Sequence, residues 1–207
     1  MVLVPKDADA DLSDRRPLTI ITLTSRIWSL HQAGARNEGF ASWHPSGLRG
    51  ATLAQTCHAI MWELETRFQD ARNVGGQAFV LSMDLSQCFG RFASVNLLHI
   101  VVPLGLWPCV HALQNDHRLQ RLLMVDGEPI YSWLRGDLLG GVSQGCALSG
   151  IFCTVAGAAW MLHVMRGLPD AKAYTYLGDR IVVVNTSADL AILLRLIAEV
   201  HRCGLHF

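Results

Sequence analysis

Apolar residues recur at helical spacing in several parts of the chain. From Ala51 this spacing predicts an amphipathic helix that ends before Gly75. Its apolar positions are Leu53, Cys57, Ile60, Met61, Leu64 and Phe68. Further helices are predicted from about Ser94 to a break near Pro103 and from Pro108 onward, because proline suits a first helical turn. The stretch "ADLAILLRLIAEVHRCG" predicts a last helix that stops at its glycine.

Other segments have the composition of strands and turns. "QAFVLSMDLSQCF" predicts a buried strand that ends in a carboxylate at Asp84. "RLLMVDGEPIYSW" predicts a hairpin that reverses at residues 126–127, and "YTYLGDRIVVV" predicts a second one with Gly178 and Asp179 at its reversal. Residues 16–30 form a β-prone run, and a loop is expected from there to Gly50.

This mixture of helices and tight hairpins predicts an α+β fold, with an antiparallel sheet covered on one face by helices. The segment from Ala147 to Met165 is apolar and about long enough to cross a bilayer. It is rich in small residues, contains His163 and lacks flanking basic clusters, which favours a buried core helix and no membrane contact.

Composition narrows the function further. The 17 basic and 17 acidic residues cancel, which argues against a protein that holds nucleic acid through net charge alone. Hydrophobic residues make up 51% of the chain and charged residues 16%, so some apolar surfaces are expected to be covered by partners. The six cysteines form no CxxC pair and the N-terminus has no secretory pattern, which together favour an intracellular protein with reduced thiols.

Asp84 and Asp179 are the candidate metal ligands, because each lies where a strand ends or turns. Two carboxylates on adjacent strands can share hard cations, the arrangement needed to stabilise the oxygens of phosphoryl transfer. Spacing does not exclude the alternative that each aspartate is an ordinary turn or cap residue.

Four stretches together carry a resemblance to a known family. In order, "RPLTIITLTSRIW", "FVLSMDLSQCFGRF", "GVSQGCALSGIF" and "YLGDRIVVV" resemble the fingers motif and motifs A, B and C of reverse transcriptases, particularly the non-LTR retroelement kind. The resemblance implies a fingers portion over residues 1–75 and a palm portion over residues 76–207, truncated before motif D and the thumb. It also implies addition of dNTPs to a DNA primer on an RNA template, with Mg²⁺ or alternatively Mn²⁺ as cofactor.

The resemblance assigns a role to individual residues around the expected metal ions. Asp84 matches the motif A metal ligand, the carbonyl of Leu85 is expected to contact the second ion, and Asp179 matches the second aspartate of motif C. Gly178 stands where the family has the first motif C aspartate. A site without that carboxylate is expected to bind Mg²⁺ weakly and to lose on the order of a thousandfold in rate.

The resemblance also assigns nucleotide-binding residues. Phe89 matches the aromatic that excludes a 2′-hydroxyl, although an ordinary core aromatic is the alternative. Gln144 and Gly145 match the motif B residues beneath the nascent base pair, and Arg16 matches the fingers arginine at the triphosphate, with Lys6 in a similar role. The serine at position 149 matches the family's "PLS" serine or, equally, caps the helix that follows.

Three hypotheses therefore remain open at the level of sequence. The first is a reverse transcriptase domain whose activity is reduced by Gly178. The second is a catalytically inactive remnant that binds nucleic acid. The third is a product that does not fold stably, because the apolar helix is present while a thumb is expected to be missing.

Overall fold

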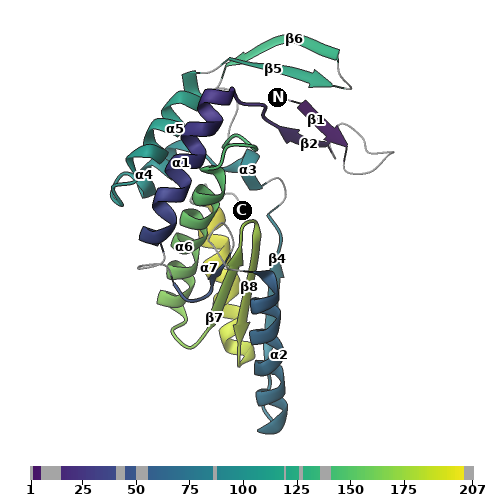
Figure 1. The fold of residues 1–207 in the computed structure, drawn as a ribbon. Coiled ribbons are helices and arrows are strands. Elements are labelled where there is room, and N and C mark those ends of the chain that lie inside the picture. The colour runs from purple at the N-terminus through teal and green to yellow at the C-terminus, as the bar shows by residue number, and fades with distance from the viewer. Residues whose placement is uncertain are drawn as a thin grey trace. The chain divides into compact units, whose positions relative to one another are not determined.

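The computed structural model of the chain describes residues 2–5, 15–40, 45–49, 56–85, 88–118, 120–125, 128–135 and 141–202 (Figure 1). The chain divides into two compact units that alternate along the sequence. Unit 1 comprises residues 1–35 and 87–152, and unit 2 comprises residues 36–86 and 153–207. Each unit takes residues from both the expected fingers and palm portions, and that functional division stays a prediction.

Unit 1 contains a four-stranded sheet in the order β2-β1-β5-β6. Its strands are β1 (Val2–Pro5), β2 (Arg15–Leu18), β5 (Gln120–Val125) and β6 (Glu128–Arg135). The hairpin predicted between β5 and β6 is confirmed, since Val125 pairs with Glu128; its turn residues lie outside the described residues. The short helix α3 (Cys88–Arg91) lies within the motif A stretch.

The other helices of unit 1 are α4 (Ser94–Val101) and α5 (Trp107–Arg118), together with most of α1 (Leu23–Phe40). The predicted break near Pro103 is confirmed, because α4 ends at Val101 and α5 begins at Trp107. Leu97, Val101 and Leu113 are at most 1% exposed, so these two helices supply much of the apolar core of unit 1.

The expectation of a β-prone run over residues 16–30 is wrong beyond Leu18, because α1 begins at Leu23. Thr22 explains the start of this helix. Its hydroxyl accepts a hydrogen bond from the amide of Ser25 at 3.3 Å, and its carbonyl accepts one from the amide of Arg26 at 2.9 Å. The bond to the Ser25 amide satisfies one of the amides that a helix start leaves without partners, and the bond from the Arg26 amide is the first within the helix.

Unit 2 contains a second four-stranded sheet in the order β3-β7-β8-β4. Its strands are β3 (Leu48–Arg49), β4 (Phe79–Met83), β7 (Lys172–Tyr176) and β8 (Asp179–Val184). β7 and β8 are antiparallel, as are β8 and β4, whereas β3 runs parallel to β7. The α+β prediction is confirmed, with a mixed sheet in this unit.

Helices pack on both faces of the unit 2 sheet, because successive residues of a strand point to opposite faces. Val182 and Val184 pack with α7 (Ser187–Arg202) and with α6 (Ser149–Gly167), most of which belongs to this unit. Val183 and Tyr174 pack instead with Ile60 and Leu64 of α2 (Cys57–Asn73). The sequence prediction placed helices on one face, and the second layer comes from the amphipathic helix α2.

Helix α6 is confirmed as a core helix. All eight residues from 151 to 158 are buried, and small residues among them allow close packing. Gly157, for example, lies where an added Cβ would be 3.0 Å from the hydroxyl of Thr175 on β7. Within the described part of the chain, no helix combines the length and apolar character needed to cross a membrane.

Candidate metal and nucleotide site

Asp84 and Asp179 lie opposite one another on adjacent strands of unit 2. The last assigned pair between β4 and β8 is Met83 with Arg180, so Asp84 and Asp179 are one step further along the same register. The amide of Leu85 then donates to the carbonyl of Gly178 at 3.3 Å, which makes that next pair hydrogen-bonded. Because the pattern alternates, the two aspartates form a non-hydrogen-bonded pair, whose Cα atoms are typically about 4.5 Å apart.

This register also places both carboxylates on one face of the sheet, the face that α2 covers further along the strands. Both aspartates are solvent-exposed, whereas Leu85 is buried at 6% exposure. Like charges directly opposite each other destabilise a sheet, and a bound cation relieves that repulsion. Their adjacency agrees with the sequence prediction, and their role as metal ligands stays a prediction.

The reversal of the hairpin lies one residue earlier than predicted. Tyr176 pairs with Asp179, so the two-residue turn is Leu177 and Gly178, and Asp179 is the first residue of β8. Leu177 has φ 50°, a left-handed conformation that glycine adopts more easily than leucine. Gly178 is not among the positive-φ glycines of the described residues.

Arg180 holds this turn from inside the protein. It is 1% exposed, and its Nη1 donates to the carbonyl oxygens of Leu177 and, at 3.0 Å, of Asp179. The guanidinium carbon lies 5.8 Å from the centroid of the Trp160 ring, within the range of a cation–π contact. Sequence analysis missed this residue, because an arginine at the start of a strand is usually solvent-exposed.

A cavity of about 290 Å³ in unit 2 borders Asp84 and is lined by residues of β4, β8, α6 and α7. Asp84 and Arg180 are its charged lining residues, and the others are Met83, Leu85, Trp160, Ile197 and Val200. Leu85, which lines this cavity, is buried, and it follows Asp84 directly after the end of β4.

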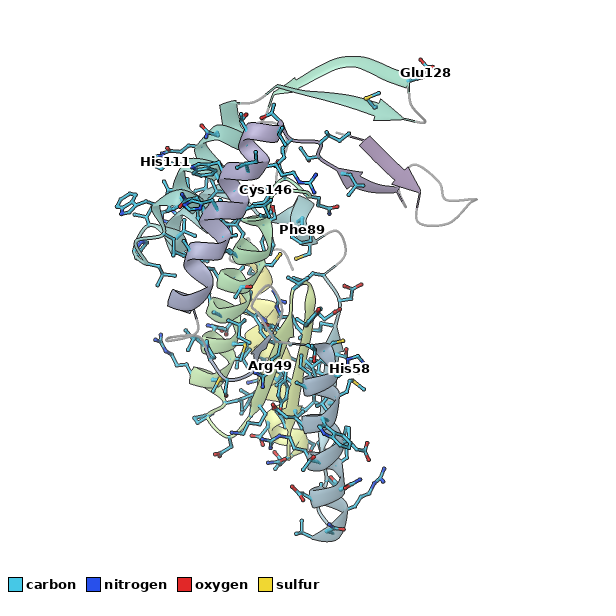
Figure 2. All side chains as sticks on the ribbon, in the orientation of Figure 1. Arg49, His58, Phe89, His111, Glu128 and Cys146 are labelled. Atoms are coloured by element: carbon cyan, nitrogen blue, oxygen red, sulfur yellow. The ribbon has the colours of Figure 1, made fainter. Side chains whose placement is uncertain are left out.

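Unit 1 brings together other predicted site residues. The amide of Val142 donates to the carbonyl of Phe89 at 2.7 Å, so the motif B segment, residues 141–152, lies against α3. The amide of Thr19 donates to the carbonyl of Gln144 at 2.8 Å, which joins the same segment to the chain just after β2. Figure 2 labels Phe89 in α3 and Cys146 in the motif B segment.

The remaining predicted nucleotide-binding residues are placed less completely. Arg16 lies in β2 opposite Val4, three residues before Thr19. Lys6 lies outside the described residues. Sequence analysis missed Thr19, because a residue whose backbone amide makes the contact leaves no signal in its side-chain type. The nucleotide-binding roles of Phe89 and Arg16 stay predictions.

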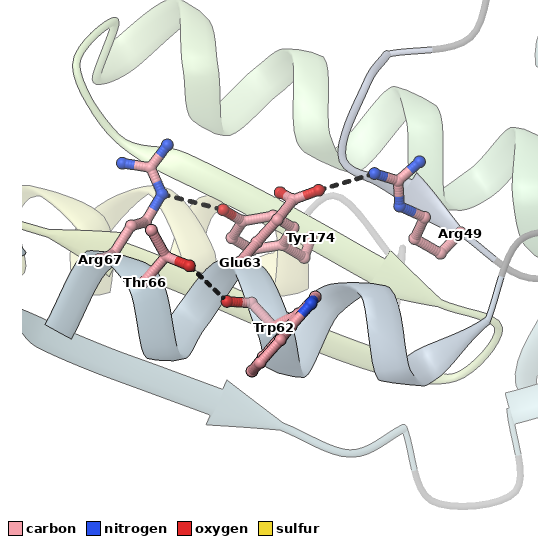
Figure 3. A network of polar contacts seen from close by, with 6 residues as sticks. All are labelled: Arg49, Trp62, Glu63, Thr66, Arg67 and Tyr174. Carbon is pink, nitrogen blue, oxygen red and sulfur yellow. Dashed lines mark hydrogen bonds and ion pairs between the residues drawn. The ribbon is translucent and has the colours of Figure 1, made fainter. Parts of the chain in front are cut away.

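Polar side chains connect α2 to the sheet of unit 2 (Figure 3). Arg49 of β3 forms an ion pair with Glu63 at 2.8 Å, and Nε of Arg67 donates to the hydroxyl of Tyr174 at 3.0 Å. Burial raises the pKa of Tyr174 above 10.0, Arg67 opposes the shift, and the neighbouring Glu63 carboxylate adds to it. These contacts hold α2 against the face of the sheet that carries the aspartates.

The chemistry of the donor set at Asp84 and Asp179 fits Mg²⁺. No group of three or more histidine, cysteine or acidic side chains suited to a metal occurs among the described residues. Mg²⁺ commonly takes one or two protein carboxylates and completes its octahedron with water and substrate phosphates. Two opposed, exposed carboxylates meet that requirement, whereas a closed structural zinc site needs four ligands.

No known protein family and no curated protein matches the sequence. Solved structures do resemble the fold. The apo telomerase of Candida tropicalis matches 87% of this chain with a TM-score of 0.54 and 14% sequence identity. A form of that telomerase truncated from the C-terminal domain matches 87% of this chain with a TM-score of 0.51 and 13% sequence identity. A Candida albicans telomerase in complex with a fragment of telomeric RNA has 0.48 at 13% over 84%.

The matched region covers 38% of the truncated C. tropicalis telomerase chain and 34% of the apo C. tropicalis chain. It covers 31% of the C. albicans telomerase chain. This chain therefore spans about a third of their length. The two C. tropicalis telomerase structures have TM-scores above 0.5, so the fold of this chain is similar to the corresponding part of those structures. The identity is too low to carry activity with it.

Proposed function

We propose that the chain is a reverse transcriptase domain of the non-LTR retroelement type, which adds dNTPs to a DNA primer on an RNA template. The observation that carries the proposal is the opposition of Asp84 and Asp179 at the end of adjacent strands in a reverse-transcriptase-like fold. The order of the four sequence motifs supports the retroelement type.

In this proposal the two units bind different parts of the substrates. Asp84 and Asp179 of unit 2 hold divalent cations, preferably Mg²⁺, with the carbonyl of Leu85 as a further oxygen ligand. When bound, such cations stabilise the charge on the attacking and leaving oxygens of an in-line displacement. Gln144 and Gly145 of unit 1 support the nascent base pair.

The sugar and the triphosphate are assigned to other residues of the chain. Phe89 excludes a ribose 2′-hydroxyl by its bulk. Arg16 and Lys6 neutralise the triphosphate, a task for which the planar guanidinium is well suited. The RNA template and DNA primer bind through their phosphates, so their affinity falls steeply with salt.

Gly178 favours a second candidate function, a nucleic-acid-binding remnant that has lost its chemistry. Two opposed carboxylates bind a cation, but the family's motif C supplies one more at position 178. The cost of losing a principal ligand is about a thousandfold in rate, or about 4 kcal/mol.

Primer extension with a Gly178→Asp variant separates the two functions. The added carboxylate restores the residue type of the family's motif C, so it is expected to raise dNTP incorporation by about a thousandfold over the wild type. Asp84→Asn in the same background serves as the control and should abolish the gain. Absence of any incorporation in the Gly178→Asp variant, together with salt-dependent primer–template binding by both proteins, would select the remnant.

A further inference from the structure

The motif B segment of unit 1 is held by backbone hydrogen bonds to two other parts of the chain. On one side, the amide of Gly141 donates to the carbonyl of Phe92 at 2.8 Å, alongside the bond from Val142 to Phe89. On the other side, the carbonyl of Gln144 accepts the amide of Thr19. The segment thus connects α3 with the end of β2.

The motif B segment approaches Thr19 closely because residue 145 is a glycine. Gly145 has φ 114°, and a Cβ at this position would lie 2.6 Å from the carbonyl oxygen of Thr19. Because the two backbones touch directly, any rotation of the turn at Gln144 and Gly145 moves it relative to β2. The geometry of this turn therefore decides how Gln144 is aligned with the strand that carries Arg16.

The hydroxyl of Ser149 fixes that turn. Ser149 is the first residue of α6 and is 3% exposed, and its Oγ donates to the carbonyl of Ser143 at 2.6 Å. The same carbonyl accepts the amide of Cys146 at 3.2 Å, and the amide of Ser149 donates to the carbonyl of Cys146 at 3.0 Å. Three bonds thereby close residues 143–149 into one compact structure.

The direction of the Ser149 bond distinguishes positioning from helix capping. A capping serine accepts hydrogen bonds from amides two or three residues further along the helix. Ser149 instead donates backward, to the residue immediately before Gln144. The carbonyl of Ser143 is buried with its residue at 2% exposure, so loss of the hydroxyl leaves a buried acceptor with one bond fewer.

We propose that Ser149 is a positioning residue for the nucleotide: its hydroxyl fixes the turn at Gln144 and Gly145 and, through the bond to Thr19, the alignment of that turn with β2. The proposal rests on the proposed function for its ligand, a deoxynucleoside triphosphate. It does not depend on the aspartate pair of unit 2, so the two can be tested separately.

The experiment compares Ser149→Ala with two controls in the full chain. Ser149→Thr keeps the hydroxyl, and Ser94→Ala removes another buried serine that begins a helix of unit 1. Hydrogen exchange at the amide of Thr19 reports on the turn without any ligand. Equilibrium binding of dGTP in the presence of Mg²⁺ reports on the nucleotide, and Mn²⁺ binding reports on the aspartate pair.

In Ser149→Ala we expect about tenfold faster exchange at Thr19, about tenfold weaker dGTP binding and unchanged Mn²⁺ affinity. Ser149→Thr and Ser94→Ala should stay within about threefold of the wild type on all three readouts. If Ser149→Thr does not fold, the comparison of the two alanine variants still decides the matter.

Unchanged Thr19 exchange in Ser149→Ala would overturn the proposal, and so would faster exchange with wild-type dGTP affinity. Equal effects of Ser94→Ala and Ser149→Ala would overturn it as well, since a general loss of stability would then explain both. A wild-type chain that binds no dGTP would refute both the proposed function and nucleotide positioning by Ser149, whereas normal dGTP binding without Mn²⁺ binding would refute the metal site alone.

Discussion

Replacing Gly141 with alanine should break the contact between the motif B segment and α3. Gly141 has φ 89°, and an added Cβ would lie 2.3 Å from the carbonyl oxygen of Phe89 and 2.5 Å from Cα of Gly90. Both neighbours are backbone atoms, so no side-chain rotation relieves the overlap. The segment must move away from α3 instead.

Two contributions determine how much Gly141→Ala lowers the free energy of unfolding. The positive φ costs alanine about 1–2 kcal/mol. Movement away from α3 weakens the bonds of Gly141 to Phe92 and of Val142 to Phe89, at about 1 kcal/mol each, and more where a buried group loses its partner. Together these contributions destabilise unit 1 by about 3–5 kcal/mol.

Gly105 provides a matched control in the same unit. It also has a positive φ, of 66°, but an added Cβ would meet nothing within 4 Å. Gly105→Ala should therefore cost only the conformational term of about 1–2 kcal/mol. Urea unfolding followed by circular dichroism measures both variants. A Gly141→Ala variant no less stable than Gly105→Ala would refute the close packing of the motif B segment on α3.

Two further predictions concern unit 2. The pKa of Tyr174 is raised in the folded state, so stability should fall as the pH rises through and above 10.0. Urea unfolding at increasing pH should show a flatter fall for Tyr174→Phe than for the wild type. An unchanged pH profile in this variant would contradict the prediction. Leu193 is fully buried, so Leu193→Ala should lower the free energy of unfolding by about 2–5 kcal/mol. Leu194 is exposed, so Leu194→Ala should lower it by less than about 1 kcal/mol. Equal losses in the two variants would contradict the described core.

Much of the fold follows from local sequence signals. Pro103 and Pro108 mark the break between α4 and α5, and the apolar spacing at Ile60 and Leu64 marks the buried side of α2. Met61 belongs to the same predicted apolar set but is 61% exposed. Periodicity thus identifies a helix reliably, while the width of its buried stripe depends on the neighbouring sheet.

The aspartate pair was predictable because each carboxylate ends or begins a strand with a clear pattern. The register that sets them opposite each other depends on the turn at Leu177 and Gly178, where a leucine adopts the left-handed conformation against its own preference. Arg180 stabilises that turn from the core, and long-range packing of this kind has no signature in a local window of sequence.

The start of α1 also depends on contacts that a local composition does not reveal. The β-prone residues before Thr22 dominate the composition of the segment, but hydrogen bonds made by a single threonine start the helix. Likewise, Thr19 contacts the motif B segment through its backbone amide. Contacts made by the backbone depend on the fold, and the side-chain sequence does not encode them visibly.

In the proposed site Asp84 and Asp179 share one divalent cation, and electron paramagnetic resonance of Mn²⁺ measures the affinity of that cation. We expect Asp84→Asn and Asp179→Asn each to weaken Mn²⁺ binding at least about tenfold, with little further loss in the double variant, because the two carboxylates act on one ion. Asp170→Asn, at an exposed aspartate of the same unit, should change nothing. Wild-type Mn²⁺ affinity in both single variants would contradict a cation site shared by the two carboxylates.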